Sequence, residues 1–312
     1  MRREFVESLV SIAEADERVV LLTGDLGFAA LEPFSERFPD RFFNAGVAEQ
    51  NMVGMATGMA EAGLTPYVYS ISTFASMRAY EFIRNGPVLH DLPVRIVGIG
   101  EGADYSHNGI THYALEDVAL MRAQPGLALV NPASSGQVAP LMRAVQDQPG
   151  PAYIRLSKQS CAVPGLPDEF ELGRAQRIGD GDDVAIVALG AMATNAVACA
   201  ELLAERGVRA SVVVVASVSP APIEDLTAWL SPISLALTVE AHYITGGVGS
   251  LVAEVIAEQG LQCRLVRAGA KAAPVGMAGS LGYMHEQLGL SPERLADRVL
   301  EALQATRGAV VL

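Results

Sequence analysis

Short apolar runs alternate with longer segments of mixed polarity along the first half of the chain. Apolar runs of this length are typical of buried strands, and the longer segments repeat apolar residues at helical spacing. The predicted strands cover residues 19–23, 66–71, 94–99, 127–131 and 153–156, and the predicted helices cover residues 2–15, 28–38, 74–89, 116–121 and 134–145. This alternation predicts a parallel sheet with right-handed crossovers and helices on both faces.

The same alternation restarts after an irregular segment at residues 161–183, which contains two prolines and several glycines. Predicted strands then cover residues 184–189, 210–215, 235–239 and 263–266, with predicted helices at 194–206, 249–258 and 292–305. We therefore predict an α/β chain with two doubly wound α/β domains, at residues 1–160 and 184–312, joined by a linker at 161–183. Ligands of such sheets bind beyond the carboxyl ends of the strands, so site residues are expected on loops that follow strands.

The segment at residues 42–60, FFNAGVAEQNMVGMATGMA, has no strongly polar face. A helix that is apolar all round is buried in a core or at a subunit contact. Gly54 and Gly58 lie four residues apart and allow another backbone to approach closely, so we expect this helix to pack on a second chain. Glu49 lies at its start, where a carboxyl group is costly to bury unless something binds it. The alternative is that Glu49 only favours the helix macrodipole.

The composition narrows the classes of function. The chain has 312 residues, of which 50% are hydrophobic, and this length suits two domains with cores of their own. A net charge of −13 disfavours nucleic acid and anionic membrane surfaces as partners. No apolar run reaches transmembrane length. Cys161, Cys199 and Cys263 fit neither a disulfide framework nor a zinc site, so we expect a reducing, cytoplasmic location.

Three motifs together carry a family resemblance. They are FFNAGVAEQNMVGMATGMAEAG at residues 42–63, STF at 72–74 and NGITH at 108–112. Over nearly its whole length the chain resembles the carboxy-terminal half of transketolase, and in particular the small subunits of split, two-chain transketolases. Deoxyxylulose-phosphate synthase is similar too. The resemblance implies a pyrimidine-binding domain of thiamine diphosphate enzymes, followed by a transketolase C-terminal domain.

The resemblance also implies a cofactor and a partner. In this family thiamine diphosphate lies between two chains, and a companion N-terminal subunit would hold its diphosphate together with Mg²⁺ or a similar divalent ion. The sequence has no metal-binding constellation of its own, so we expect no metal ligands in this chain. Because closed oligomers commonly have two-fold symmetry, the expected assembly is an α2β2 heterotetramer.

Four residues match positions that bind the cofactor in this family. Glu49 matches the catalytic glutamate that hydrogen-bonds the pyrimidine ring nitrogen and favours the imino tautomer, which takes the proton from the thiazolium carbon. Phe74 matches the aromatic residue that stacks on the pyrimidine, with a simple core position as the alternative. Asp25 and Leu26 match positions that line the thiamine pocket, and Asp25 alternatively caps the turn that follows it.

Three further residues match positions that contact the substrate. His112 matches a catalytic histidine that binds the sugar and assists proton transfer at its carbonyl oxygen. Lys158 and Arg155 lie where the family places basic residues for an acceptor phosphate. Lys158 stands in place of an expected arginine and so lacks the bidentate fork, and Arg155 alternatively braces the domain.

The loop before His112 departs from the family pattern at two positions. Asn108 stands where transketolases for ordinary sugar phosphates tend to carry aspartate. A second family histidine would fall near Gly100 and is absent, and whether His107 replaces it stays open. Asn108 and His107 are therefore candidate substrate-binding residues, and the donor sugar is left undefined.

Two glycine-rich segments imitate ligand sites. Residues 179–181, with Asn195 further on, resemble the diphosphate and metal motif of the family, but their spacing is too short and they precede a strand, so we interpret them as a turn. Residues 246–249 precede a helix, and tight packing of strand and helix is the expected reason for their glycines. No role is assigned to His242.

The predicted function is that of the pyrimidine-binding subunit of a two-component transketolase, which transfers a two-carbon ketol unit between sugar-type substrates. One alternative is the beta subunit of a 2-oxo-acid dehydrogenase or of a pyruvate-using synthase. The loop at residues 108–112 favours ketol transfer over oxidative decarboxylation. The other alternative, a catalytically silent scaffold subunit, is disfavoured by the presence of both Glu49 and Phe74.

Overall fold

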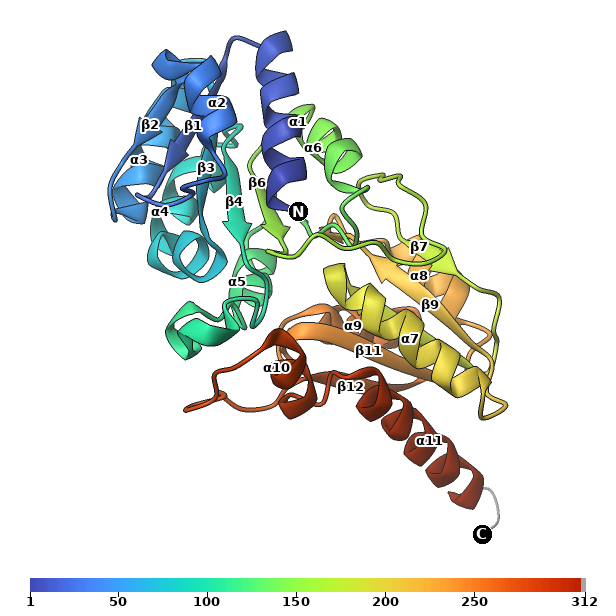
Figure 1. The fold of residues 1–312 in the computed structure, drawn as a ribbon. Helices are drawn as coiled ribbons and strands as arrows, with labels where there is room; N and C mark the ends of the chain where they lie inside the picture. Colours follow the sequence, from blue (N-terminus) through green and yellow to red (C-terminus); the bar gives the residue numbers. More distant parts are fainter. Residues whose placement is uncertain (310–312) are drawn as a thin grey trace.

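Two β-sheets organise residues 1–309, which are the residues that the computed structural model describes (Figure 1). Within this part of the chain, one sheet has seven strands in the order β10-β5-β6-β4-β3-β1-β2. The other sheet has five strands in the order β12-β11-β8-β9-β7. The α/β class predicted from the sequence, with one sheet in each half of the chain, is confirmed.

The seven-stranded sheet is parallel except at one edge. Its strands are β1 (Val19–Thr23), β2 (Phe42–Asn44), β3 (Thr65–Ile71), β4 (Arg95–Ile99), β5 (Ala128–Val130), β6 (Ala152–Leu156) and β10 (Ser217–Ser219). β10 pairs antiparallel with β5, and the other neighbours pair in parallel. Every residue of β1, β4 and β6 is buried, which explains why these strands are mostly apolar; the exceptions include the buried Arg95 in β4 and Arg155 in β6.

Helices cover both faces of this sheet (Figure 1). One face carries α1 (Arg2–Ala15), α2 (Glu32–Arg37) and α6 (Val138–Gln146), and the other carries α3 (Glu49–Glu61), α4 (Tyr80–Ile83) and α5 (Asp117–Arg122). Successive strand residues point to opposite faces, so Leu21 packs in the core that contains Phe5 of α1 while Leu22 packs in the core that contains Met52 of α3. The apolar helix predicted at the 42–60 segment is thus α3, with Glu49 as its first residue.

The segment after β3 is not the single regular helix that was predicted over residues 74–89. It forms a π-helical turn at Phe74–Arg78, then α4, then a second π-helical turn at Arg84–Val88. Pro87 lies inside the second turn, where it cannot donate a backbone hydrogen bond. π-helical turns are often found at functional sites, because they displace side chains from regular helical positions.

The five-stranded sheet belongs to the C-terminal half. Its strands are β7 (Gln176–Ile178), β8 (Val184–Leu189), β9 (Ala210–Val215), β11 (Leu235–Tyr243) and β12 (Arg264–Ala270), and its helices are α7 (Ala193–Ala204), α8 (Ile223–Leu230), α9 (Val248–Glu258), α10 (Leu281–Gln287) and α11 (Pro292–Ala309). β7 pairs antiparallel with β9, and the remaining pairs are parallel. β7 lies within the segment that the sequence analysis expected to be an irregular linker.

The two halves of the chain share one β-sheet and one apolar core cluster. β10 follows β9 in the chain, yet it extends the N-terminal sheet at the edge of β5, where Ser217 pairs with Val130. One continuous apolar cluster contains Met52 of the N-terminal half and Val187 of the C-terminal half. Among the described residues, no helix is both long enough and apolar enough to cross a membrane.

Candidate functional site

Glu49 is a buried carboxylate held on both of its oxygens. Its side chain is only 1% exposed. Ser70 Oγ, from β3, donates to Oε1 at 3.0 Å, and Arg78 donates to Oε2 at 3.0 Å. A Cβ built on Gly24 would lie 3.3 Å from Oε1, so the loop after β1 also lies close to the carboxylate. The start of α3 favours a negative charge at this position, but burial to this degree requires the partners as well.

Phe74 follows β3, and Arg78 connects it with Glu49, because the Arg78 side chain contacts both residues. The Arg78 guanidinium carbon is 4.0 Å from the centroid of the Phe74 ring. The His112 ring approaches the same ring edge-on, at a centroid distance of 5.2 Å. Phe74 is partly exposed and belongs to none of the apolar core clusters, so its ring is available to a flat ligand.

The turn after β1 brings Asp25 and Leu26 to the same end of the sheet. Asp25 adopts a left-handed conformation with φ of 58°, which is unusual for a residue other than glycine. Asn44, at the end of the neighbouring β2, holds it: the Asn44 side chain donates to Asp25 Oδ1 at 2.9 Å and accepts from the Asp25 amide at 3.1 Å. Thr23 Oγ1 donates to the Leu26 carbonyl at 2.8 Å. The Asp25 side chain is exposed, so it remains available to a ligand.

The loop after β4 carries the predicted substrate residues. It forms short 3₁₀ turns at Ser106–Asn108 and Ile110–His112, separated by Gly109. His107 and Asn108 are exposed on this loop, whereas His112 is half-buried. The His112 ring lies 5.2 Å from Phe74 and 6.2 Å from Tyr105, measured between ring centroids.

Lys158 extends this row of side chains. Its Nζ lies 4.6 Å from the centroid of the Tyr105 ring, and its exposed fraction is intermediate. Each side chain in this row contacts the next one, in the order Glu49, Arg78, Phe74, His112, Tyr105 and Lys158. Gly100 has a φ of 90°, and a Cβ there would lie 2.3 Å from the Tyr105 ring. A histidine at position 100 would therefore displace Tyr105, which gives a physical reason for the glycine.

Arg155 lies outside this row and has no exposed surface. Its guanidinium donates to Asp117 at 2.7 Å and to Glu101 at 3.3 Å. It also donates to the carbonyls of Ala114, at 3.0 Å, and of Ala241 in β11, at 2.9 Å. A guanidinium whose donors are all used inside the protein has none left for a substrate phosphate. This geometry favours the bracing role that the sequence analysis gave as the alternative.

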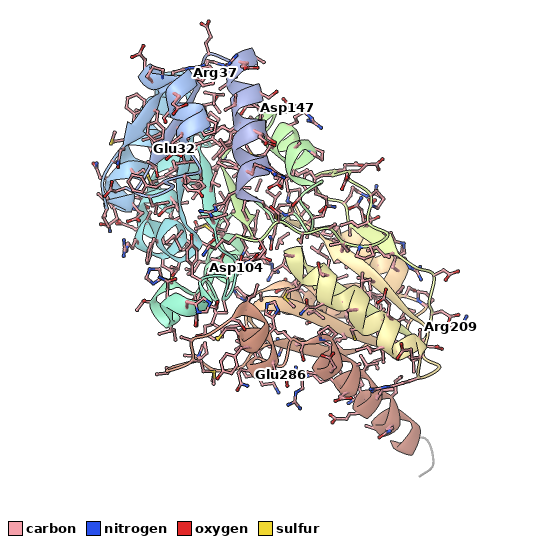
Figure 2. All side chains as sticks on the ribbon, in the orientation of Figure 1. Glu32, Arg37, Asp104, Asp147, Arg209 and Glu286 are labelled. Atoms are coloured by element: carbon pink, nitrogen blue, oxygen red, sulfur yellow. The ribbon has the colours of Figure 1, made fainter. Side chains whose placement is uncertain are left out.

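The ion pairs of Arg155 form part of a buried acidic cluster at the junction of the two halves. Burial raises the pKa of Glu101 to about 7, although Arg155 opposes this shift. Burial also raises the pKa of Asp104, although that carboxylate accepts hydrogen bonds from the Lys158 amide at 2.7 Å and from Ser157 Oγ at 2.9 Å. Figure 2 shows Asp104 between the N-terminal and C-terminal halves. Asp104 thereby ties the loop after β4 to Ser157 and to the backbone amide of Lys158.

Comparison with known proteins shows the family to which the chain belongs. Residues 1–163 match the family model described as the transketolase pyrimidine binding domain, and residues 173–295 match the transketolase C-terminal domain. The chain belongs to the transketolase family. The family resemblance and the fold that the motifs implied are therefore confirmed.

Three transketolase relatives match almost end to end. A Methanocaldococcus jannaschii protein named as a putative transketolase C-terminal section is 35% identical over 308 residues, covering 97% of this chain and 96% of that protein. The 6-deoxy-6-sulfo-D-fructose transketolase subunit SqwH of a Clostridium species is 34% identical over 306 residues, covering 97% of this chain and 94% of that protein. A solved structure described as a split gene transketolase, inactive beta4 tetramer, superimposes with a TM-score of 0.89 at 33% identity, covering 97% of this chain and 98% of that one.

The row of side chains from Glu49 to Lys158 includes two residues that the sequence-based prediction missed, Arg78 and Tyr105. Arg78 lies four residues after Phe74, and helical spacing of that kind places two side chains on one face. That spacing was a usable signal for Arg78. Tyr105 had a weaker signal, since an aromatic residue in a loop after a strand is compatible with many roles.

No group of three or more His, Cys, Asp or Glu side chains that could hold a metal occurs among residues 1–309. The segment 179–181 precedes β8, and a Cβ on Gly181 would lie 2.5 Å from the backbone of Ala210, so this glycine serves close packing. Asn195 donates to the Leu290 carbonyl at 2.8 Å. These two parts of the apparent metal motif thus make packing contacts in the C-terminal half.

The second glycine-rich segment is filled by the chain itself. The Glu240 carboxylate accepts hydrogen bonds from the amides of Val248, at 2.8 Å, and Gly249, at 3.1 Å, at the start of α9. A carboxylate at that position takes the place that a phosphate would need. His242 has no exposed surface, and its Nε2 accepts from the Ala119 amide of α5 at 3.3 Å. His242 therefore connects the C-terminal sheet to the N-terminal half.

Proposed function

We propose that this chain is the pyrimidine-binding subunit of a thiamine diphosphate-dependent, two-component transketolase, which moves a two-carbon ketol unit between sugar-type substrates. One observation carries the proposal: Arg78 contacts both the buried Glu49 carboxylate and the ring of the partly exposed Phe74, and His112 contacts the same ring. These are the groups that an aminopyrimidine needs, namely a hydrogen-bonding carboxyl group and a flat apolar surface.

Each residue of the site has a distinct task in this proposal. When bound, thiamine diphosphate supplies the nucleophilic carbon that carries the ketol unit. Glu49 shares a hydrogen bond with the pyrimidine ring nitrogen and thereby selects the tautomer that moves the proton. Phe74 stacks on the pyrimidine and fixes its plane. Asp25 and Leu26 border the thiamine from the turn after β1.

The substrate end of the site lies at the row of His112, Tyr105 and Lys158. In this proposal His112 hydrogen-bonds a sugar hydroxyl and assists proton transfer at the carbonyl oxygen. Lys158 offers a point charge to an anionic group of the acceptor, since its side chain is partly exposed. His107 and Asn108 lie on the same loop and contact the donor sugar.

A companion subunit completes the cofactor site in this proposal. It holds the diphosphate and a divalent ion such as Mg²⁺, because a diphosphate needs a cation with oxygen ligands to neutralise it. The split gene transketolase described as an inactive beta4 tetramer supports the need for such a companion. An assembly of two copies of each chain, α2β2, satisfies two-fold symmetry.

The exposed side of α3 supports a subunit contact. Met55 is 36% exposed and Phe82 of the adjacent α4 is 39% exposed. A Cβ on Gly58 would meet nothing within 4 Å, so packing inside this chain does not require a glycine there. A second backbone that approaches this side would require it, as the sequence analysis expected.

Glu49→Gln tests the proposal directly. The chain is co-purified with its companion and assayed with ketose donors, thiamine diphosphate and Mg²⁺. We expect a rate loss of about 10² to 10⁴, because general acid–base contributions have this size. Glu61→Gln, on the exposed end of the same helix, is the matched control and should leave the rate unchanged. A Glu49→Gln rate within a few-fold of the parent would refute the proposed function.

A further inference from the structure

Arg78 contacts both groups that the proposed function assigns to the pyrimidine. Its guanidinium donates to Glu49 Oε2 at 3.0 Å, and the guanidinium carbon lies 4.0 Å from the centroid of the Phe74 ring. Its side chain is 46% exposed, whereas that of Glu49 is 1% exposed. One half-exposed side chain therefore reaches inward to the fixed carboxylate and lies over the aromatic ring at the same time.

A guanidinium in this position resembles an aminopyrimidine in its chemistry. Both groups are flat and delocalised, and both carry hydrogen-bond donors in the plane. Arginine stacks on aromatic faces at the distance seen here, and a neutral heteroaromatic ring stacks on the same surface. The space next to Glu49 Oε2 and over the Phe74 ring therefore suits either group, but not both at once.

We infer that Arg78 occupies the pyrimidine position of the isolated chain and has to leave it when the cofactor binds. This inference rests on the proposed function of Glu49 and Phe74. Arg78 belongs to the π-helical turn at Phe74–Arg78 and is half-exposed, so its side chain can rotate towards solvent without disturbing the core. Glu49 stays in place, because Ser70 holds its other oxygen.

The arrangement makes Arg78 a competitor of the pyrimidine. Without a ligand, it satisfies a buried carboxylate that would otherwise have only the Ser70 hydroxyl as a partner. The complete cofactor, held at its diphosphate end by the companion, displaces this side chain. The opposite arrangement is a permanent brace, in which Arg78 stays on Glu49 and the pyrimidine stacks on the other face of Phe74.

The two arrangements predict opposite effects on binding, and calorimetry with thiamine distinguishes them. Thiamine carries the aminopyrimidine but no diphosphate, so its binding needs no metal and can be measured on this chain's part of the site alone. We expect Arg78→Met to bind thiamine roughly tenfold more tightly than the parent chain, because a partly exposed ion pair and a cation–π contact no longer compete. Arg84→Met, an exposed position of the same segment, should leave the affinity unchanged.

A second pair of variants locates the effect. In the double variant Arg78→Met/Glu49→Gln the gain should disappear, because the carboxylate that both groups share is gone. If Arg78→Met does not fold, Arg78→Lys keeps the charge but loses the flat stacking group, and a gain of a few-fold is expected there.

Unchanged or weaker thiamine binding by Arg78→Met, or no measurable binding, would overturn the competitor role and indicate a brace. This failure differs from failure of the proposed function, which is read from Glu49→Gln in the reconstituted pair. Loss of ketol transfer by Glu49→Gln together with weaker thiamine binding by Arg78→Met would retain the function and reject the competitor.

Discussion

Replacing Glu101 by glutamine is expected to make the free energy of unfolding less dependent on pH between pH 5 and pH 8. Glu101 is buried at the junction of the two halves, where it accepts hydrogen bonds from Asn131 at 2.7 Å and from Arg155 at 3.3 Å. Burial raises the pKa of its carboxyl from the usual 4.5 to about 7. The folded chain therefore keeps a proton that the unfolded chain releases at lower pH, and the free energy of unfolding falls as pH rises between about 4.5 and 7.

The size of the effect follows from these two pKa values. Between pH 5 and pH 8, the free energy of unfolding should fall by roughly 2 to 3 kcal/mol through this carboxyl, at about 1.36 kcal/mol per pKa unit. Glutamine cannot ionise, so Glu101→Gln lacks this contribution. A lost or misoriented hydrogen bond of the glutamine amide would change the free energy of unfolding by the same amount at every pH. The change in this free energy between pH 5 and pH 8 therefore reports the ionisation of Glu101 alone.

Urea unfolding of the isolated chain at pH 5, 6, 7 and 8 measures this difference. With a urea dependence of about 3 kcal/mol per molar, the midpoint of the parent should fall by on the order of 1 M relative to Glu101→Gln over this range. Glu61→Gln, which is exposed on α3, controls for the removal of one charge and should follow the parent. A constant difference between parent and Glu101→Gln at all four pH values would show that Glu101 is already ionised at pH 5 in the folded chain.

Two further variants test the site. Phe74→Ala should weaken thiamine diphosphate binding by the reconstituted pair by about tenfold, since stacking between aromatic rings contributes about 0.5–1.5 kcal/mol beyond area burial. The melting temperature of the cofactor-free chain should change little. An unfolded Phe74→Ala chain would instead indicate that Phe74 is a core residue. Asn108→Asp should shift the preference among donor sugars with an unchanged cofactor affinity, because Asn108 lies on the substrate loop, away from Glu49 and Phe74 in the chain. An altered cofactor affinity with the same donor profile would argue against that placement.

The regular part of the fold was predictable because both faces of each central strand are covered. β8 and β9 match the predicted strands at residues 184–189 and 210–215 residue for residue, since uninterrupted apolar runs have no other stable environment. β2, β7 and β10 were missed because each has only three residues and none of them lies in an uninterrupted apolar run such as the one that contains β5. The positions of β2 and β10 depend on neighbours that are distant in sequence, namely β1 and β5.

The site divides in a similar way. The placement of Glu49, Phe74 and His112 near one another agrees with the motif-based prediction, because each follows a strand of one parallel sheet. The surroundings of Arg155 were not predictable, because its acceptors include the Ala241 carbonyl, 86 residues away in the chain. A basic residue in a strand has the same local pattern whether it faces a ligand or an internal carboxylate, and only the tertiary contacts distinguish the two.

The strand β10 has a consequence for how this chain can be divided. A fragment that ends near residue 163 contains a full family domain by sequence match, yet it lacks the strand that closes the β5 edge of its sheet. An uncovered edge strand offers free amide and carbonyl groups to any other strand, which favours aggregation. The fragment would also lose the Ala241 carbonyl that accepts from Arg155. A cut between the two domains would therefore leave β5 as an exposed edge strand of the N-terminal domain. Truncations and fusions of this protein should therefore avoid the segment that joins the two halves.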